Sequence, residues 1–278
     1  MIVHLVDGTY ELFRHFYGQR SFNKGKDKPF GAAAGVLNGI LQMIEEGATH
    51  IGVATDHIIE SFRNDLYAGY KTGAGIERVL RSQFTPLEEG LAAMGVVVWP
   101  MVELEADDAL ASAAYLASKD KAVLKVCIWT PDKDLAQCVR SDRVVQIDRR
   151  AKIIRDEEGV RKKFGVLPPL IPDLLALVGD AADGYPGIKG IGSTGAARLL
   201  NQYGPIEKFP KSVLGDRLND ALLFKKLATL RTDAKLFRKA DELKWKGPTP
   251  SFEKFVKKIG DNRLLERANK LAESLVQR

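Results

Sequence analysis

The hydrophobic positions in the first half of the chain alternate between short β-rich runs and longer segments with helical spacing. Residues 32–46 and 106–118 carry apolar side chains three and four positions apart, which predicts helices that each bury one face. Strands that alternate with helices in this way indicate an α/β fold, with a mostly parallel sheet flanked by helices. We predict five strands, at residues 2–6, 51–55, 96–99, 124–130 and 144–147.

The character of the chain changes at a proline cluster formed by Pro168, Pro169 and Pro172. Beyond it the β-rich runs disappear and helical spacing continues to the end. We therefore predict a boundary near residue 166, with an α/β domain over 1–165 and a helical region over 166–278. With 278 residues and 45% hydrophobic content, the chain can bury a sizeable core.

The composition excludes several classes of protein. No apolar run approaches the roughly 20 residues that a membrane-spanning helix requires. The first residues lack the basic start and cleavage site of a secretory signal, so we expect a cytoplasmic protein. The two cysteines, Cys127 and Cys138, fall in a predicted strand and a predicted helix without a histidine pair at ligand spacing, which predicts structural thiols.

Acidic side chains come directly after the predicted strands. The carboxyl ends of parallel strands meet at one edge of a sheet, where open α/β folds place their ligands. Three of the acids begin a helix just after the third strand and should face the same edge. Seven carboxylates are therefore expected to gather there, namely Asp7, Asp56, Glu105, Asp107, Asp108, Asp132 and Asp134.

Each of these acids taken alone has an ordinary structural explanation. Asp107 and Asp108 suit the first turn of a helix, Asp132 could cap the next helix, and Asp7 could belong to a turn. Together, however, like charges in one pocket raise one another's pKa values and destabilise the fold unless cations neutralise them. We therefore expect hard divalent ions with oxygen ligands, Mg²⁺ in the first place with Mn²⁺ as a substitute.

Two further acids, Asp180 and Asp183, follow the apolar run 174–178, and their spacing lets both face one direction. Periodicity does not decide whether they join the other seven. The net charge is +6, and without these nine carboxylates it would be +15. A basic body around an acidic pocket suits an enzyme that attracts phosphates and holds cations.

A glycine-rich segment at 186–195 leads into a helical pattern at 196–203. Glycine permits close backbone approach, and Ser193 or Thr194 can cap the helix so that amide groups face a phosphate. No strand precedes the segment, which argues against a dinucleotide-binding loop or a P-loop. We predict a helix-hairpin-helix near 172–203 that grips a nucleic-acid backbone. Its expected contacts are Gly187, Lys189, Gly190, Gly192, Ser193 and Thr194.

Aromatic and basic residues alternate directly after Asp56. Tyr70 can stack an unpaired base while Arg63 and Lys71 neutralise the phosphate that is cut. A solvated loop whose tyrosines belong to the core fits these residues equally well. The following stretch, 72–81, is expected to be mobile without substrate. Further DNA contacts are expected from Tyr67, Arg78 and Arg81.

These motifs resemble the 5′-nuclease superfamily, specifically the bacterial 5′→3′ exonuclease domain that occurs at the N-terminus of DNA polymerase I, in phage 5′-nucleases and as stand-alone proteins. The resemblance runs over nearly the whole chain. The matching segments, in the family's order and spacing, are Val6-Asp7-Gly8 with Phe13-Arg14, Asp56 followed by Ser61-Phe62-Arg63 and Tyr70-Lys71, Glu105-Ala106-Asp107-Asp108, Thr130-Pro131-Asp132-Lys133-Asp134-Leu135, and Gly179-Asp180 through Gly187-Ile188-Lys189-Gly190-Ile191-Gly192.

The resemblance implies roles for these residues. Arg63, Tyr70 and Lys71 would belong to a helical arch near 62–84 around the 5′ single strand. The hairpin would hold the downstream duplex and bind K⁺. One metal position would be served by Asp7, Asp56, Glu105, Asp107 and Asp108, and a second by Asp132, Asp134, Asp180 and Asp183.

The chain departs from the family pattern in two places. The usual Ser-Asp-Asn around the last acid is Ala182-Asp183-Gly184, and the arch segment lacks the usual prolines. No polymerase follows within these residues, so the expectation is a stand-alone, monomeric nuclease.

The expected function is that of a structure-specific 5′-nuclease, acting as a 5′→3′ exonuclease and flap endonuclease. It would hydrolyse DNA phosphodiester bonds by a two-metal mechanism, with Lys71 and Arg63 stabilising charge on the phosphate. Flaps, nicks and other 5′ ends are the expected substrates, with RNA primers as a further candidate.

Two alternatives remain open at this point. A PIN-type ribonuclease has a related sheet but calls for neither the second helical region nor the hairpin. A non-catalytic branched-DNA binding protein would gain nothing from an acidic pocket that repels phosphates.

Overall fold

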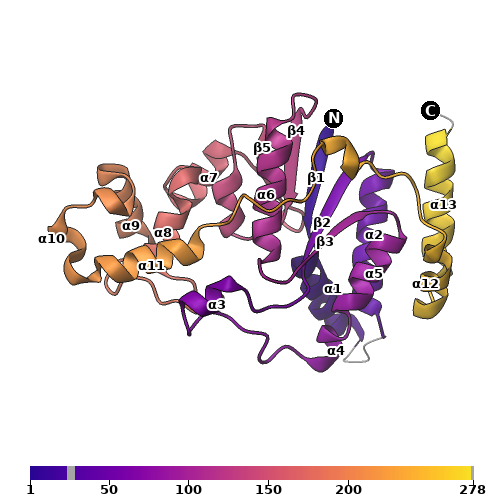
Figure 1. Ribbon diagram of the computed structural model, residues 1–278, viewed down its shortest axis with the longest axis horizontal. Coiled ribbons are helices and arrows are strands. Elements are labelled where there is room, and N and C mark those ends of the chain that lie inside the picture. Colours follow the sequence, from indigo (N-terminus) through magenta and orange to yellow (C-terminus); the bar gives the residue numbers. More distant parts are fainter. Residues whose placement is uncertain (24–28, 277–278) are drawn as a thin grey trace.

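A six-stranded sheet forms the centre of the molecule in the computed structural model, which describes residues 1–23 and 29–276 (Figure 1). The strand order is β3-β2-β1-β4-β5-β6, with β1 to β5 parallel and β6 antiparallel to β5. The strands are β1 (Ile2–Asp7), β2 (His50–Asp56), β3 (Val97–Met101), β4 (Lys125–Trp129), β5 (Val144–Asp148) and β6 (Ile153–Arg155).

All five predicted strands are confirmed, and with them the α/β class. The sixth strand was missed. It has only three residues, and its first two side chains, Ile153 and Ile154, are 46% and 65% exposed, so no buried alternation marks it. Its position at the edge of the sheet explains this exposure, because an edge strand has a neighbour on one side only.

Helices surround the sheet and form the second region. The α-helices are α1 (Gly8–Asn23), α2 (Gly31–Glu45), α3 (Phe62–Leu66), α4 (Arg78–Arg81), α5 (Phe84–Ala93), α6 (Ala106–Lys119), α7 (Glu157–Phe164), α8 (Ile171–Val178), α9 (Ser193–Tyr203), α10 (Lys211–Leu214), α11 (Leu218–Ala228), α12 (Ser251–Ile259) and α13 (Asn262–Val276). Short 3₁₀ turns are η1 (Asp134–Cys138), η2 (Pro168–Leu170), η3 (Ile206–Lys208), η4 (Gly215–Arg217) and η5 (Ala240–Leu243).

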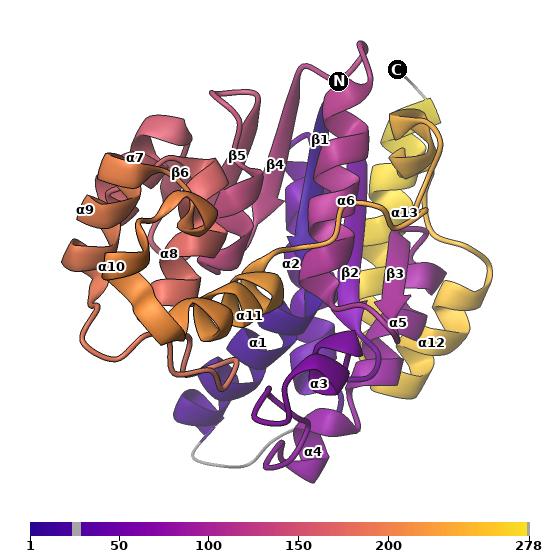
Figure 2. The ribbon, with the colours of Figure 1, turned by 60° about the vertical axis from the view of Figure 1, so that its left-hand side comes forward.

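Each face of the sheet is covered by a separate apolar cluster. Helices α1, α2 and α5 pack on one face through residues such as Leu12, Leu37 and Leu91. Helix α6 packs on the other face through its buried alanines and Leu110, and it crosses that face in Figure 2. A third cluster joins α8, α9 and α11 into a helical lobe, drawn in pink to orange in Figure 1. Among the described residues no helix is long and apolar enough to cross a membrane.

The last two helices do not belong to that lobe. An extended stretch around residues 230–250 returns to the sheet, and α12 and α13 then pack against α5 and α2 (Figure 1). Phe252, Phe255 and Val256 are buried in the cluster that α2 and α5 line. The predicted helical region over 166–278 is thus helical for much of its length, but residues 251–276 lie with the first region, because their apolar side chains complete its core.

Candidate active site

The acids predicted to meet at one edge of the sheet do so. Strands β1, β2 and β4 are parallel neighbours, and their carboxyl ends lie together. Asp7 is the last residue of β1 and Asp56 is the last residue of β2. Burial, together with the charges of Asp56 and Asp132, raises the pKa of Asp7 to about 7. Burial and the charges of Asp132 and Asp7 raise the pKa of Asp107 well above its usual range.

Two backbone amides and one hydroxyl hold the first two carboxylates in place. Asp7 accepts hydrogen bonds from the amide of Tyr10 (2.8 Å) and the hydroxyl of Thr130 (3.1 Å). Asp56 accepts one from the amide of Ala106 (2.8 Å), the first residue of α6. The starts of α1 and α6 therefore fix acids that belong to neighbouring strands.

A second group of acids comes together from η1 and the segment after α8. Oxygen atoms of Asp134, Asp180 and Asp183 all lie within 4.8 Å of one another, and the three side chains are buried. Asp134 Oδ1 is buried without a hydrogen-bond partner among the described residues. Burial and the charge of Asp132 are the main causes that raise the pKa of Asp134 well above its usual range. This set of buried oxygens fits a divalent cation with oxygen ligands.

The turn after α8 depends on two glycines that contact each other. A Cβ atom on Gly179 would lie 2.5 Å from the carbonyl carbon of Pro186, and one on Gly187 would overlap the amide of Gly179. The Asp180 amide donates to the carbonyl of Tyr185 (2.9 Å) and closes the turn. The question that the sequence left open is answered here, since Asp180 and Asp183 do join the other acids. Gly187, predicted to contact DNA, packs on Gly179.

Two lysines approach this second group. Lys71 Nζ lies 2.9 Å from Asp183 Oδ1 and 2.6 Å from Glu105 Oε2. Lys133 Nζ lies 2.7 Å from Asp180 Oδ2. Lys133 is not among the residues predicted to be functional, although its place between two acids in the sequence was a signal for it.

Arg63 does not face the solvent, where the sequence analysis expected it. Its side chain is 1% exposed. Its guanidinium donates to both oxygens of Asp108 at 2.7 Å and to Glu105 Oε1 at 2.9 Å. It also donates to two carbonyls at the end of α11, those of Leu227 (2.8 Å) and Thr229 (3.3 Å). Arg63 therefore ties the base of the expected arch to α6 and to the helical lobe, and no donor is left for a phosphate.

The same contacts occupy two of the nine predicted metal ligands. Asp108 is fully buried and accepts two further bonds, from the amides of Glu105 (3.0 Å) and Arg231 (2.8 Å). Glu105 also accepts from the hydroxyls of Ser61 (2.7 Å) and Tyr70 (3.3 Å). Both carboxylates are thus satisfied by protein donors in this arrangement, unlike Asp134 with its unpartnered Oδ1.

The two tyrosines of the expected arch pack against the helical lobe, Tyr70 fully and Tyr67 in part. Tyr70 is 4% exposed and belongs to the apolar cluster of the lobe. Tyr67 packs edge-on against Phe224, with ring centroids 5.8 Å apart. For Tyr70 the structure therefore supports the alternative in which the ring is a core residue, since a buried ring offers no face to an unpaired base, whereas the ring of Tyr67 is half-buried. Arg78 and Arg81, on the short helix α4, are exposed.

Gly184, which replaces the usual Asn, has a packing reason. A Cβ atom there would overlap the carbonyl oxygen of Gly69, at the base of the arch. Next to this contact, the Lys71 amide donates to the carbonyl of Asp183 (2.9 Å). The small residue allows the arch base to reach the acidic turn.

The hairpin before α9 is exposed at Lys189, Gly190 and Gly192. Gly192 is the cap residue of α9, without a side-chain cap, and Ser193 and Thr194 are the first helical residues. The expected cap by Ser193 or Thr194 is therefore absent, because these residues already lie inside the helix. The amides of the first turn have no partner within the helix and face outward to potential acceptors.

A mostly parallel sheet whose carboxyl edge gathers buried acids, joined to a helical lobe, is the arrangement expected of metal-assisted phosphodiester-cleaving proteins. Comparison with known proteins makes the assignment specific. Residues 2–165 match the family of the 5′-3′ exonuclease, N-terminal resolvase-like domain, and residues 166–251 match the 5′-3′ exonuclease, C-terminal SAM fold. The chain belongs to the 5′-3′ exonuclease family.

Individual relatives agree with this assignment. The chain is 35% identical over 248 residues to a 5′-3′ exonuclease of Buchnera aphidicola, covering 82% of this chain and 81% of that protein. It is 34% identical over 256 residues to a 5′-3′ exonuclease of Aquifex aeolicus, covering 88% and 87%. Its fold is similar to that of the bacteriophage T5 D15 flap endonuclease, solved as a pseudo-enzyme-product complex with DNA and metal ions (TM-score 0.62, 19% identity, 98% of each chain covered). The predicted fold and nuclease class are confirmed.

Proposed function

We propose that this member of the family is a structure-specific 5′-nuclease that uses two divalent ions, Mg²⁺ in the cell, to cut DNA near a 5′ end or flap. The observation that carries the proposal is the acidic edge, and above all the buried, unpartnered Asp134 Oδ1 beside Asp180 and Asp183. A buried carboxylate oxygen without a donor is costly unless a cation or another donor approaches it.

The acids divide into two sets, one for each ion. Asp134, Asp180 and Asp183 would hold one ion, with Asp132 beside them. Asp7, Asp56 and Asp107 would hold the other, with Glu105 and Asp108 supporting from behind. When bound, the ions would neutralise charge on the attacking and leaving oxygens of the phosphodiester.

Lys71 is the cation best placed to act on a phosphate at this site. Its side chain is 30% exposed, and it bridges Glu105 and Asp183, one acid from each set. The two carboxylates raise its pKa well above the usual range even though burial acts in the opposite direction, so Nζ keeps its proton at neutral pH. We assign Lys71 to charge stabilisation at the phosphate.

Arg63 has a different role in this proposal. Because all its N–H groups are engaged, it positions Glu105 and the arch base without touching the substrate. This replaces the direct phosphate contact that the family resemblance implies for it.

DNA would be held by exposed cations and backbone amides on either side of the acidic edge. Arg78 and Arg81 suit the 5′ single strand, and Lys189 with the first-turn amides of α9 suits the duplex. We propose a monomer that accepts RNA primers as well as DNA, and a K⁺ ion at the hairpin carbonyls. The carbonyl of Lys189 would contribute least to that ion, because it already accepts from Arg217 (2.9 Å).

The test compares end-labelled flap, nicked and blunt DNA and a single-stranded RNA, with and without Mg²⁺. The wild type should release short 5′ products from the flap only with Mg²⁺. Asp134→Asn should abolish release while DNA binding persists, and Asp142→Asn, a change of an exposed acid, should not. Preferred cleavage of the RNA would favour a PIN-type activity. Flap binding without cleavage in Mg²⁺ or Mn²⁺ would identify a non-catalytic binder.

A further inference from the structure

A positively charged surface lies beside the acidic edge, on the face of the sheet that α1 and α2 cover. It is a cavity of about 690 Å³ between α1, α2, α13 and the turn that joins β5 to β6. Four arginines line it, Arg14, Arg149, Arg150 and Arg267, and Glu45 is the one acid in the lining. We call it the arginine groove.

Two of these arginines lack an acidic partner among the described residues. Arg149 donates to neutral acceptors, the side chain of Gln42 (2.9 Å) and the carbonyl of Gly39 (3.4 Å). Arg150 is exposed, with no hydrogen bond or ion pair to the described residues. By contrast, Arg14 pairs with Glu11 (2.5 Å) and Arg267 with Glu45 (2.9 Å). The end of the groove at the β5–β6 turn therefore carries the uncompensated charge.

The groove leads to the acidic edge. A smaller cavity shares Arg14, Arg149 and Arg150 with it and is also lined by Tyr10, Thr130, Pro131 and Glu11, the acid that pairs with Arg14. Tyr10 and Thr130 are the two residues that donate to Asp7, and Pro131 directly precedes Asp132. A row of arginines thus begins beside the acids and extends along α1 and α2 toward α13.

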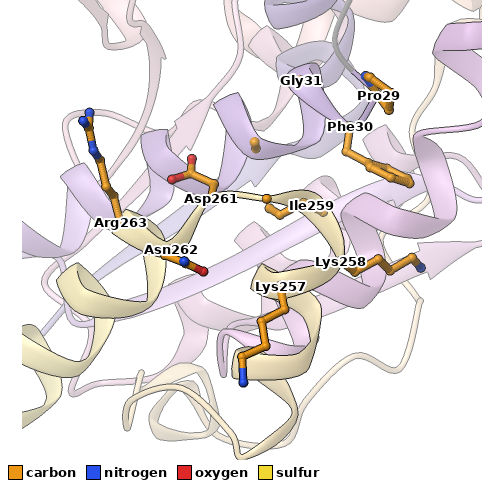
Figure 3. Close-up of a pocket in the computed structure, with 11 residues that line it drawn as sticks. Pro29, Phe30, Gly31, Lys257, Lys258, Ile259, Asp261, Asn262 and Arg263 are labelled. Carbon is orange, nitrogen blue, oxygen red and sulfur yellow. The ribbon is translucent and has the colours of Figure 1, made fainter.

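Another large cavity lacks this character. It has a volume of about 800 Å³ and lies between the start of α2 and the junction of α12 with α13 (Figure 3). Its two lysines are paired, Lys257 with Glu253 (2.6 Å) and Lys258 with Glu89 (3.2 Å), and its single arginine, Arg263, shares the lining with Asp261. The amides of the first turn of α2 are occupied by Gln83. Of these two cavities in the described part of the chain, the arginine groove alone combines unpaired cations with continuity to the acids.

We propose that the arginine groove binds consecutive phosphates of one strand of the DNA substrate as that strand leaves the acidic edge across α1 and α2. The proposal rests on the proposed function, which supplies a DNA strand at the edge. Arginine suits phosphate because its planar fork matches the phosphate oxygens. The elongated shape and the row of several arginines favour a polyanion over a single small anion.

The test uses the pair Arg149→Gln with Arg150→Gln in the full-length protein. Binding of a flap DNA is measured by fluorescence anisotropy over a range of salt concentrations, with Ca²⁺ present to hold cleavage back. The double variant should bind the flap DNA about tenfold more weakly. The slope of the logarithm of its binding constant against the logarithm of the salt concentration should be less steep by about 1.8, because each lost phosphate contact removes about 0.9 from the slope. The rate at saturating DNA with Mg²⁺ should stay within about twofold of wild type, because the phosphates bound here are not the one that is cut.

The matched control removes two positive charges at the opposite end of the sheet, Lys121→Gln with Arg143→Gln, and should leave the salt dependence unchanged. If the Arg149 change impairs folding, Arg150→Gln alone should lower the slope by about 0.9. A slope equal to that of wild type overturns the proposal, as does an equal effect of the control pair. The proposal is also overturned if added inorganic phosphate weakens DNA binding while the double variant keeps the wild-type salt dependence. That result would indicate a site for a small anion. Absence of Mg²⁺-dependent cleavage by the wild type would instead contradict the proposed function.

Discussion

Replacement of Arg63 by methionine removes a buried side chain that donates five hydrogen bonds. The change removes the donors that Glu105 and Asp108 share and leaves two carboxylates buried next to each other. Summing the individual hydrogen bonds would overestimate the loss, because each replaces a bond to water. Measurements on other buried ion pairs indicate a cost of about 3–5 kcal/mol when one partner is removed. That is a large part of the roughly 5–15 kcal/mol that stabilises a domain.

The assay is urea unfolding of metal-free protein, followed by circular dichroism. Arg63→Met should lower the free energy of unfolding by about 3–5 kcal/mol, whereas the control Arg78→Met, at an exposed arginine of the same segment, should change it by less than about 0.5 kcal/mol. Adding Asp108→Asn to Arg63→Met should cost less than the sum of the single changes, by about 0.5–3 kcal/mol.

If Arg63→Met unfolds like the wild type while flap cleavage is lost, Arg63 leaves its buried partners to contact the substrate. The positioning role would then be refuted.

Three other predictions follow from single contacts. Gly187→Ala should destabilise the protein more than Gly190→Ala, because both glycines have positive φ but only the first would place a Cβ atom against Gly179; equal losses in urea unfolding would contradict that packing. Lys71→Met should lower the Mg²⁺-dependent rate about 10²–10³-fold with DNA affinity nearly unchanged, and a pure loss of affinity would remove its assigned role. The folded-state pKa of Asp7 is raised to about 7 from 3.8, so the metal-free protein should lose stability as pH rises from about 4 to 7, by up to about 4 kcal/mol from this group. Asp7→Asn should flatten that dependence, and an unchanged unfolding profile would show that the burial of Asp7 is not costly.

Local signals explain what the sequence could predict. A strand end is a local event, so Asp7 and Asp56 could be placed at the carboxyl edge from alternation alone. The helix that begins at Ala106 was likewise marked by its own acids and apolar spacing. The spacing of Asp180 and Asp183 indicated that both side chains face the same way, but not which part of the fold they approach. Their turn is shaped by the tertiary contact between Gly179 and Gly187, which the local sequence does not show.

The features that sequence reasoning missed depend on distant partners. Arg63 and Tyr70 look like exposed substrate contacts in a basic, aromatic stretch. In the structure they are buried, because the carbonyls of Leu227 and Thr229, more than 160 positions away, meet the arch base. In the same way, Phe252 looks like part of a second region, but its partners lie on α2 and α5. No local pattern encodes such contacts.

Counting bound Mn²⁺ ions by electron paramagnetic resonance at equilibrium tests whether cations make the acidic edge tolerable. The expected result is two saturable sites in the wild type, two in Asp142→Asn, and the loss of one in Asp134→Asn. Saturable binding that Asp134→Asn leaves untouched, or no saturable binding at all, would contradict it.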